Sequence, residues 1–268
     1  TASNNTGVGF QSLKLNTTGD SNVAVGWHSL TANTTGYYNN AIGRDALLAN
    51  TEGAHNISLG SDTMKANTTG NSNVAVGGYS LEANTTASNN IAVGYTALRA
   101  NTTGTRNTAI GVNAYNSSDT ESDNLAIGYD AMTTNTAGGQ YNTTIGNYSM
   151  DALTSADNNT AVGYNSMSAT TTGGNNVAVG YQTLLASTTG DHNTAVGFGA
   201  LTAVSTATGN TAVGAGAGDA ITTGNHNIAI GYNSLTNCTT GTNNVAVGHD
   251  AVLRITTASN NTGIGKEA

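Results

Sequence analysis

The stretch NNVAVGYQTLLASTTG, from Asn175 to Gly190, decides the fold because close variants of it fill the whole chain. The segment that follows it, residues 191–209, reads DHNTAVGFGALTAVSTATG. We call the glycine of each AVG-like triplet the marker glycine. It recurs every 17 residues from Gly9 to Gly265, with a single step of 18 between Gly128 and Gly146, which makes sixteen copies. Self-similarity at a short fixed period is the sequence signature of stacked-repeat proteins.

The length of the repeat and its local pattern predict an all-β fold. Repeats built from helix pairs need roughly 33 to 47 residues. Each N-x-A-V-G core is short and ends in glycine, and Thr-Thr-Gly segments punctuate the chain, as is typical of short strands joined by tight turns. We predict a parallel β-solenoid, or β-roll, of sixteen coils of about 17 residues, with two or three strands per coil. It should form a single repetitive domain over residues 1–268, with a one-residue insertion near 138–139.

The composition narrows the possible functions. Charged residues make up only 8% of the 268 residues and proline is absent, so the sequence does not resemble a disordered chain. A net charge of −8 disfavours binding to nucleic acid or to an anionic membrane surface. No apolar run reaches the roughly 18 residues of a membrane span, so we expect no membrane insertion. The chain begins with Thr1 and shows no signal-peptide pattern, so we expect a processed or partial chain.

An asparagine stands four residues before every marker glycine. In a stack of identical coils this column becomes a ladder, because each side-chain amide can donate to one neighbour and accept from the other. We predict an inward or corner structural ladder; a row of ligand-binding amides is the alternative. The ladder residues are Asn5, Asn22, Asn39, Asn56, Asn73, Asn90, Asn107, Asn124, Asn142, Asn159, Asn176, Asn193, Asn210, Asn227, Asn244 and Asn261.

The residue just before each marker glycine is always Val, Ile or Leu, and the one before that is nearly always Ala. Neighbours in a strand point to opposite faces, so the aliphatic column lies opposite the Ala and Asn columns. Soluble monomers rarely leave such an apolar stripe bare, so we predict a homotrimeric rod in which the stripe forms interchain contacts. A wider monomeric solenoid that buries the stripe is the alternative. The candidate contacts are Val25, Ile42, Val76, Val93, Ile110, Ile127, Val162, Val179, Val196, Val213, Ile230 and Val247.

Other columns have simpler interpretations. The Leu or Met four residues after the marker, and the Ala two residues further on, should share a strand face and fill the interior; Gly218 replaces the Leu once and should leave its coil underpacked. Many residues directly after the marker are aromatic and should lie on the surface, either as semi-exposed packing groups or as platforms for sugar rings. The candidate glycan contacts are Trp27, Tyr95, Tyr129, Tyr164, Tyr181 and Tyr232.

The sequence contains no recognisable reaction centre. No nucleophile, base and orienting acid recur together, so we expect a protein that is not an enzyme and that needs no cofactor or metal. Weak single-ion sites are the alternative, for example at Asp119-Thr120-Glu121 with Asp123. Cys238 is alone and should pack as a small apolar residue. One outward Thr per Thr-Thr-Gly corner leaves ice binding as a minor alternative.

The motifs NVAVGYQTL, NTAVGFGAL and NIAIGYNSL resemble the shaft repeats of bacteriophage tail fibres, which often precede an endosialidase-type intramolecular chaperone. They are also similar to the head β-roll of YadA-type trimeric autotransporter adhesins, although the period of 17 is longer than that of the adhesin coil. Both resemblances imply a trimer located outside the cell or on a virion. We therefore expect a structural fibre or shaft that projects or forms a receptor-binding tip, with self as the main partner and a cell-surface glycan or receptor as a further one. The alternatives are a surface adhesin that binds glycans along the rod and an ice-binding solenoid.

Overall fold

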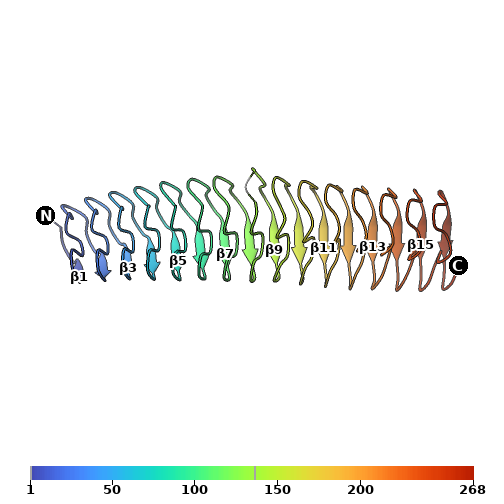
Figure 1. Ribbon diagram of the computed structural model, residues 1–268, viewed down its shortest axis with the longest axis horizontal. Coiled ribbons are helices and arrows are strands. Elements are labelled where there is room, and N and C mark those ends of the chain that lie inside the picture. Colours follow the sequence, from blue (N-terminus) through green and yellow to red (C-terminus); the bar gives the residue numbers. More distant parts are fainter. Residues whose placement is uncertain (1, 136) are drawn as a thin grey trace. The chain divides into compact units, whose positions relative to one another are not determined.

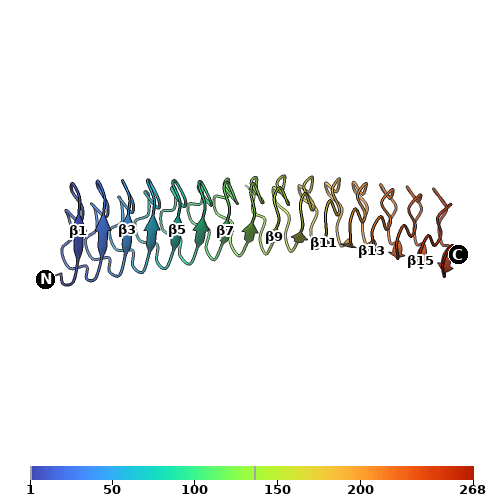
Figure 2. The same ribbon diagram turned by 90° about the horizontal axis from the view of Figure 1, so that it is seen from below.

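The computed structural model describes residues 2–135 and 137–268 and confirms the β-solenoid. The chain divides into two compact units, Thr1–Gly138 and Gly139–Ala268. Within the described residues each unit contributes eight strands of three residues, all parallel, and no helix. In each unit the coils are stacked in chain order, with one arrow and one long turn region per coil (Figure 1 and Figure 2).

The strands recur at the period of the sequence. The first unit holds β1 (Thr6–Val8), β2 (Val23–Val25), β3 (Asn40–Ile42), β4 (Ile57–Leu59), β5 (Val74–Val76), β6 (Ile91–Val93), β7 (Thr108–Ile110) and β8 (Leu125–Ile127). The second holds β9 (Thr143–Ile145), β10 (Thr160–Val162), β11 (Val177–Val179), β12 (Thr194–Val196), β13 (Thr211–Val213), β14 (Ile228–Ile230), β15 (Val245–Val247) and β16 (Thr262–Ile264). Each strand residue pairs with the residue 17 positions further on, as Ala178 does with Ala195. The repeat length therefore sets the register of the sheet within each unit.

The expectation of two or three strands per coil was wrong, because the described coils contain one strand each. The Leu or Met residues that we had assigned to a second strand have left-handed backbone angles, with φ of 49° at Leu30 and 45° at Met64. This conformation costs a residue other than glycine about 1 kcal/mol or more, and a strand cannot continue through it. Contacts with the next coil maintain it: the Leu30 N–H donates to the carbonyl of Ala46 at 3.0 Å. Stacking thus determines a turn conformation that local preference would not select.

The interior of each coil is filled by the Ala at the strand centre and by the Leu or Met. Ala178 and Leu184 are fully buried, as predicted. The Ala two residues after the Leu is not interior, however: Ala32 is half-buried and Ala186 is exposed. The turn after the Leu directs the following residue inward instead, such as Asn33, which is fully buried.

The coil at Gly218 is not underpacked as expected. A Cβ at Gly218 would lie 2.9 Å from Leu201 Cδ2 and 3.0 Å from Ile221 Cδ1, so neighbouring side chains already occupy that space. Ile221, which is fully buried, compensates for the missing leucine.

Candidate functional site

The first candidate site is the outer strand face, which we define as the first and third residues of every strand. In β2 to β15 the central strand residue is buried and its two neighbours point outward, as the sequence pattern predicts. Of the predicted interchain residues, Ile42, Ile110, Val213 and Ile230 are exposed and the others are half-buried. The aliphatic column therefore remains on the surface of this chain.

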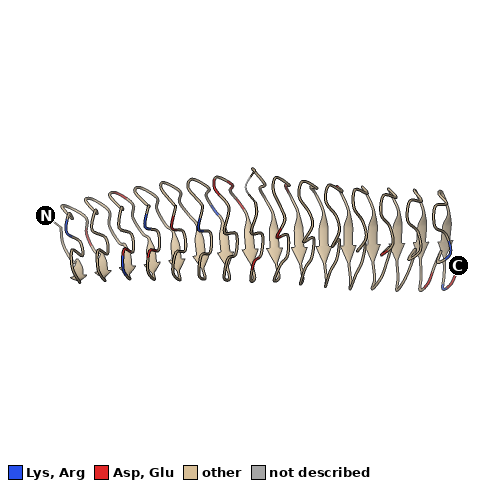
Figure 3. Cartoon of the chain, in the orientation of Figure 1, with Lys and Arg blue, Asp and Glu red and all other residues tan. Residues whose placement is uncertain are grey.

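The outer strand face carries no charge. The described strands contain no Lys, Arg, Asp or Glu, and in Figure 3 the arrows are tan while the coloured segments lie in the turns. At a strand spacing of about 4.8 Å and a width of about 10 Å, eight strands present about 400 Å² in each unit. An apolar patch of this size on a soluble protein is often functional.

The asparagine ladder is buried and its hydrogen bonds are made within the chain. The backbone N–H and the Nδ2 of Asn39 donate to Asn22 Oδ1 at 2.9 and 3.1 Å, and Asn39 Nδ2 also donates to the carbonyl of Gly53 at 2.8 Å. The same bonds recur in the second unit, as between Asn193 and Asn176. Because these amides are hydrogen-bonded within the chain and most of them are buried, the arrangement favours a structural role over ligand binding.

A second asparagine ladder, which was not predicted, lies seven residues after the marker glycine. Asn50 Nδ2 donates to Asn33 Oδ1 at 2.8 Å and to the Gly53 carbonyl at 3.0 Å. The recurring ANTTG or ANTEG motif before residue 105 could have indicated this ladder. In the second unit the same column is mixed and holds Leu153, Thr170, Ser187, Val204, Ile221, Cys238 and Ile255. Cys238 is fully buried there, and burial raises the pKa of its thiol, as fits a small packing residue.

The predicted glycan-contact residues lie on the surface, and most of their rings contact other rings. Trp27 and Tyr95 are 48% and 54% exposed. The rings of Tyr164 and Tyr181 are stacked with centroids 5.6 Å apart, and those of Tyr181 and Phe198 with centroids 5.1 Å apart. Tyr181 therefore has a ring on each side, which leaves its edge rather than its face for a partner. Glycan contact at this column stays a prediction.

Trp27, Tyr95 and Tyr232 are paired in other ways. Trp27 stacks on His28 at 3.6 Å, Tyr232 stacks on His249 at 5.2 Å, and Tyr95 meets the edge of Tyr79 at 5.8 Å. The aromatic column thus stabilises the coil stack as well as presenting apolar surface.

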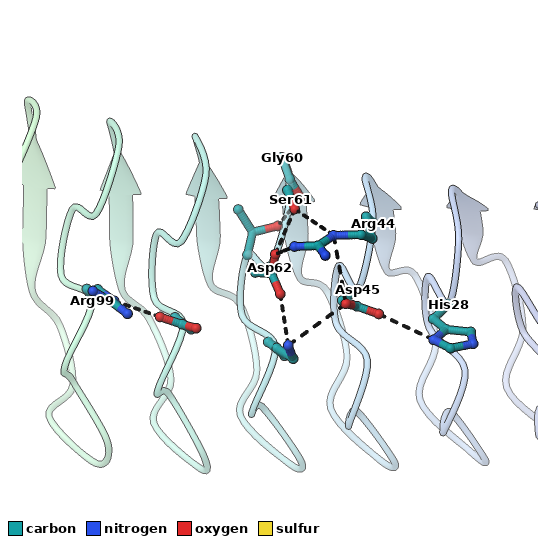
Figure 4. A network of polar contacts seen from close by, with 10 residues as sticks. His28, Arg44, Asp45, Gly60, Ser61, Asp62 and Arg99 are labelled. Carbon is teal, nitrogen blue, oxygen red and sulfur yellow. Dashed lines mark hydrogen bonds and ion pairs between the residues drawn. The ribbon is translucent and has the colours of Figure 1, made fainter.

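A charged network spans neighbouring coils of the first unit (Figure 4). Asp62 is 2% exposed; the Arg44 guanidinium donates to its Oδ2, and Lys65 Nζ donates to its Oδ1 at 2.9 Å. Ser61 Oγ donates to the same carboxylate at 2.7 Å. Burial alone would raise the pKa of Asp62, but the hydrogen bonds from Lys65 and the other donors outweigh burial and lower it.

Asp45 occupies the equivalent place one coil earlier. It is 6% exposed, with Lys65 Nζ 3.8 Å from its Oδ2 and His28 Nδ1 3.4 Å from its Oδ1. Neither Asp45 nor Asp62 was predicted to take part in a charged network, although a period of 17 places them in adjacent coils. The network neutralises its own charges, which favours a structural role.

Replacing Asp62 tests this network through its pH dependence. The folded pKa of Asp62 lies below the ordinary value of 3.8, so its contribution is fully present above that value and is lost as the pH falls through the lower, folded pKa. We expect Asp62→Asn to lower the free energy of unfolding at neutral pH by about 1–3 kcal/mol and to reduce the further loss on acidification. Denaturant titrations at neutral and acidic pH measure both effects. Glu52→Gln, at an exposed turn position, is the control; an Asp62→Asn chain with the acid sensitivity of the wild type would contradict the assignment.

The proposed weak ion site is not formed. Asp123 accepts from Arg106 Nε at 2.6 Å and from its second guanidinium nitrogen at 2.7 Å. Glu121 is turned inward toward N–H donors, so its oxygens face hydrogens rather than an open site for a cation. Across residues 2–135 and 137–268, no group of three or more His, Cys, Asp or Glu side chains could hold a metal. None of the described segments forms a helix that is long and apolar enough to cross a membrane.

The fold and these surfaces define the class of the protein as a parallel β-solenoid with buried asparagine ladders and an uncharged outer strand face. Comparison with models of known protein families, with curated proteins and with solved structures gave no match.

Proposed function

We propose that this chain is a structural protein that associates side by side with copies of itself through the outer strand face. The observation that carries the proposal is the column of Val, Ile and Leu on this face, which is continuous within each unit, is partly exposed and has no charged neighbour in the strands. Continuous apolar surface of this kind marks an interaction site. A solenoid in which every coil repeats the last suits a rigid structural element.

A second copy of the chain is the partner that fits this face best. Both surfaces would then carry the same repeat, so that aliphatic residues could meet aliphatic residues along the whole contact. In each unit the face of about 400 Å² is large enough to mark an interaction site. We propose a homotrimer, a closed assembly that the resemblance to fibre repeats favours.

The proposed role is that of a fibre or shaft that holds or forms a receptor-binding tip, outside the cell or on a virion. The resemblance to tail-fibre and adhesin-head repeats supports this location and role. The buried carboxylates of the charged network are paired with cations, which supports a structural rather than an enzymatic protein.

An adhesin that binds glycans is the second candidate, supported by the exposed aromatic column. Ice binding has less support. The hydroxyl of the first Thr in the corner donates to the next coil, as Thr34 Oγ1 does to the Thr51 carbonyl at 3.0 Å. That leaves one exposed column, formed by the second Thr of the corner, such as Thr69. A glycan array and a measurement of thermal hysteresis test these two candidates.

The self-association proposal predicts that charge on the outer strand face separates the copies. We expect the combined change Ile42→Lys, Ile110→Lys and Ile230→Lys to convert the assembly into a monomer of 26.7 kDa, because each lysine would be buried without a partner in the interface. Light scattering coupled to size-exclusion chromatography measures the mass. A variant that keeps the wild-type oligomeric mass would exclude this face as the interface.

The matched control places the same charges on exposed turn positions. Each lies seven residues before the corresponding isoleucine: Thr35→Lys, Thr103→Lys and Thr223→Lys. This variant should keep the mass of the wild type, so that a general effect of added charge can be separated from loss of the contact.

A further inference from the structure

Glu121 occupies a position of the repeat that holds small apolar residues in the rest of the first unit. The position ten residues after the marker glycine holds Gly or Ala in the other coils of the first unit, as at Gly36 and Ala87. These residues are buried, and Ala87 is 2% exposed. Glu121 occupies the same position and is also 2% exposed, so a carboxylate has replaced a hydrogen or a methyl group inside the stack.

The Glu121 carboxylate is held by four donors. Its Oε2 accepts from the N–H groups of Asp119 at 2.9 Å and Thr120 at 3.1 Å, and from Ser118 Oγ at 3.2 Å. Its Oε1 accepts from the N–H of Gly138 at 3.0 Å, in the following coil. One side chain therefore ties two successive coils of the first unit together.

Gly138 lies at the one-residue insertion of the repeat. In other coils the small buried residue stands two positions before a left-handed residue, as Gly53 does before His55. Gly139 is buried and stands two positions before Tyr141, whose φ is 59°. It therefore corresponds to the small buried residue of the other coils. The insertion consequently falls before Gly139. Gly138 is exposed and a Cβ there would meet nothing within 4 Å, as expected of an outward bulge.

Two further substitutions in the same coil accompany Glu121. Tyr115 replaces the interior Leu, and its hydroxyl accepts from the Nδ2 atoms of Asn124 at 2.6 Å and Asn135 at 3.0 Å. Burial raises the pKa of the Tyr115 phenol above its ordinary value, so the hydroxyl stays neutral. Ser118 replaces the Asn of the second ladder, and the ladder ends at Asn101, whose Oδ1 has no partner. In the coil before the insertion, hydrogen bonds to the Tyr115 hydroxyl and to the Glu121 carboxylate thus replace those of the second asparagine ladder.

We propose that Glu121 is a clamp that holds the bulge at Ala137 and Gly138 closed, and that this bulge opens locally when the Glu121 carboxylate is removed. In this role Glu121 is a positioning residue, because it acts on the backbone of Gly138. The proposal reverses the usual expectation for repeat proteins: restoring the consensus glycine at position 121 should loosen this coil rather than stabilise it.

Amide hydrogen exchange of the full chain tests the clamp at neutral pH. We expect Glu121→Gly to accelerate exchange in the peptide that contains Ala137 and Gly138 by about tenfold or more, because a charge-assisted hydrogen bond is lost. Glu121→Gln keeps the size of the side chain and should give a smaller increase, since one oxygen still accepts. Exchange in coils of the second unit, such as the one that contains Asn176, should not change.

The control is Ala87→Gly, which removes a side chain at the same position of an ordinary coil. It should leave exchange at Ala137 and Gly138 unchanged. Unaltered exchange at these residues in both Glu121 variants would overturn the proposal, as would an Ala87→Gly chain that opens the bulge to the same extent. Far-UV circular dichroism of each variant establishes that the measured chains are folded.

Discussion

Replacing Asn176 with alanine should lower the free energy of unfolding by about 4 kcal/mol, because several buried hydrogen bonds are lost at once. Asn176 Nδ2 donates to Asn159 Oδ1 at 3.2 Å and to the Gly190 carbonyl at 2.8 Å. Its Oδ1 accepts from the N–H of Asn193 at 2.8 Å and from Asn193 Nδ2 at 3.2 Å. Removal of the amide leaves these neighbouring groups buried without partners, and that penalty exceeds the value of the bonds themselves.

Equilibrium denaturation with urea measures the effect. Asn176→Asp is the sharper variant, because it keeps the size of the side chain and its acceptor but cannot donate to Asn159 or Gly190. Thr189→Ala, at an exposed position of the same coil, should change stability by less than about 0.5 kcal/mol. If Asn176→Ala were no more disruptive than Thr189→Ala, the ladder would not be the source of stability that the structure indicates.

Replacing Gly180 with alanine should be at least as damaging, with a loss of about 4 kcal/mol or failure to fold, because steric overlap adds to backbone strain. The φ of Gly180 is 137°, in the region that favours glycine, and a Cβ there would lie 2.4 Å from the carbonyl oxygen of Gly197. The marker glycine therefore permits the close approach of consecutive coils. The yield of folded chain and its thermal midpoint measure the effect.

Gly78→Ala is the matched control for the marker glycine. Gly78 follows a marker glycine directly, and the nearest atom to its Cβ would be Tyr95 Cδ2 at 3.5 Å, an ordinary contact. Alanine there should be neutral or slightly stabilising, because it restricts the unfolded chain. Equal destabilisation by the two substitutions would show that the marker position is not special.

The period of the sequence predicted the fold because it carries the register directly. A spacing of 17 between identical residues is the pairing that the strands adopt, as for Ala178 and Ala195. The inward Asn and Ala columns and the outward aliphatic column followed from the alternation of side chains in a strand. The burial of Cys238 could be predicted from its place in the repeat.

The number of strands could not be predicted, because the turn conformation at Leu30 is produced by stacking rather than by local preference. Leucine favours right-handed or extended backbone, so an L-x-A pattern indicates a strand when it is read alone. The charged network was not predicted for a different reason. Arg44 and Asp62 are 18 residues apart in the sequence and become neighbours because consecutive coils stack. The role of Glu121 depends on the path of the insertion, which no regular repeat describes.

The two proposals are independent. Self-association concerns the outer strand face, whereas the Glu121 clamp concerns the interior of one coil and the bulge that follows it. Loss of oligomerisation in the lysine variant would leave the clamp untouched, and altered hydrogen exchange at Gly138 would not identify the partner of the outer strand face.

Sedimentation equilibrium of the unmodified chain tests the central proposal most directly. Three copies of a 26.7 kDa chain predict a mass of 3 × 26.7 kDa, about 80 kDa, that persists on dilution. A single species of 26.7 kDa at all concentrations would contradict the proposal that the outer strand face joins copies of this chain.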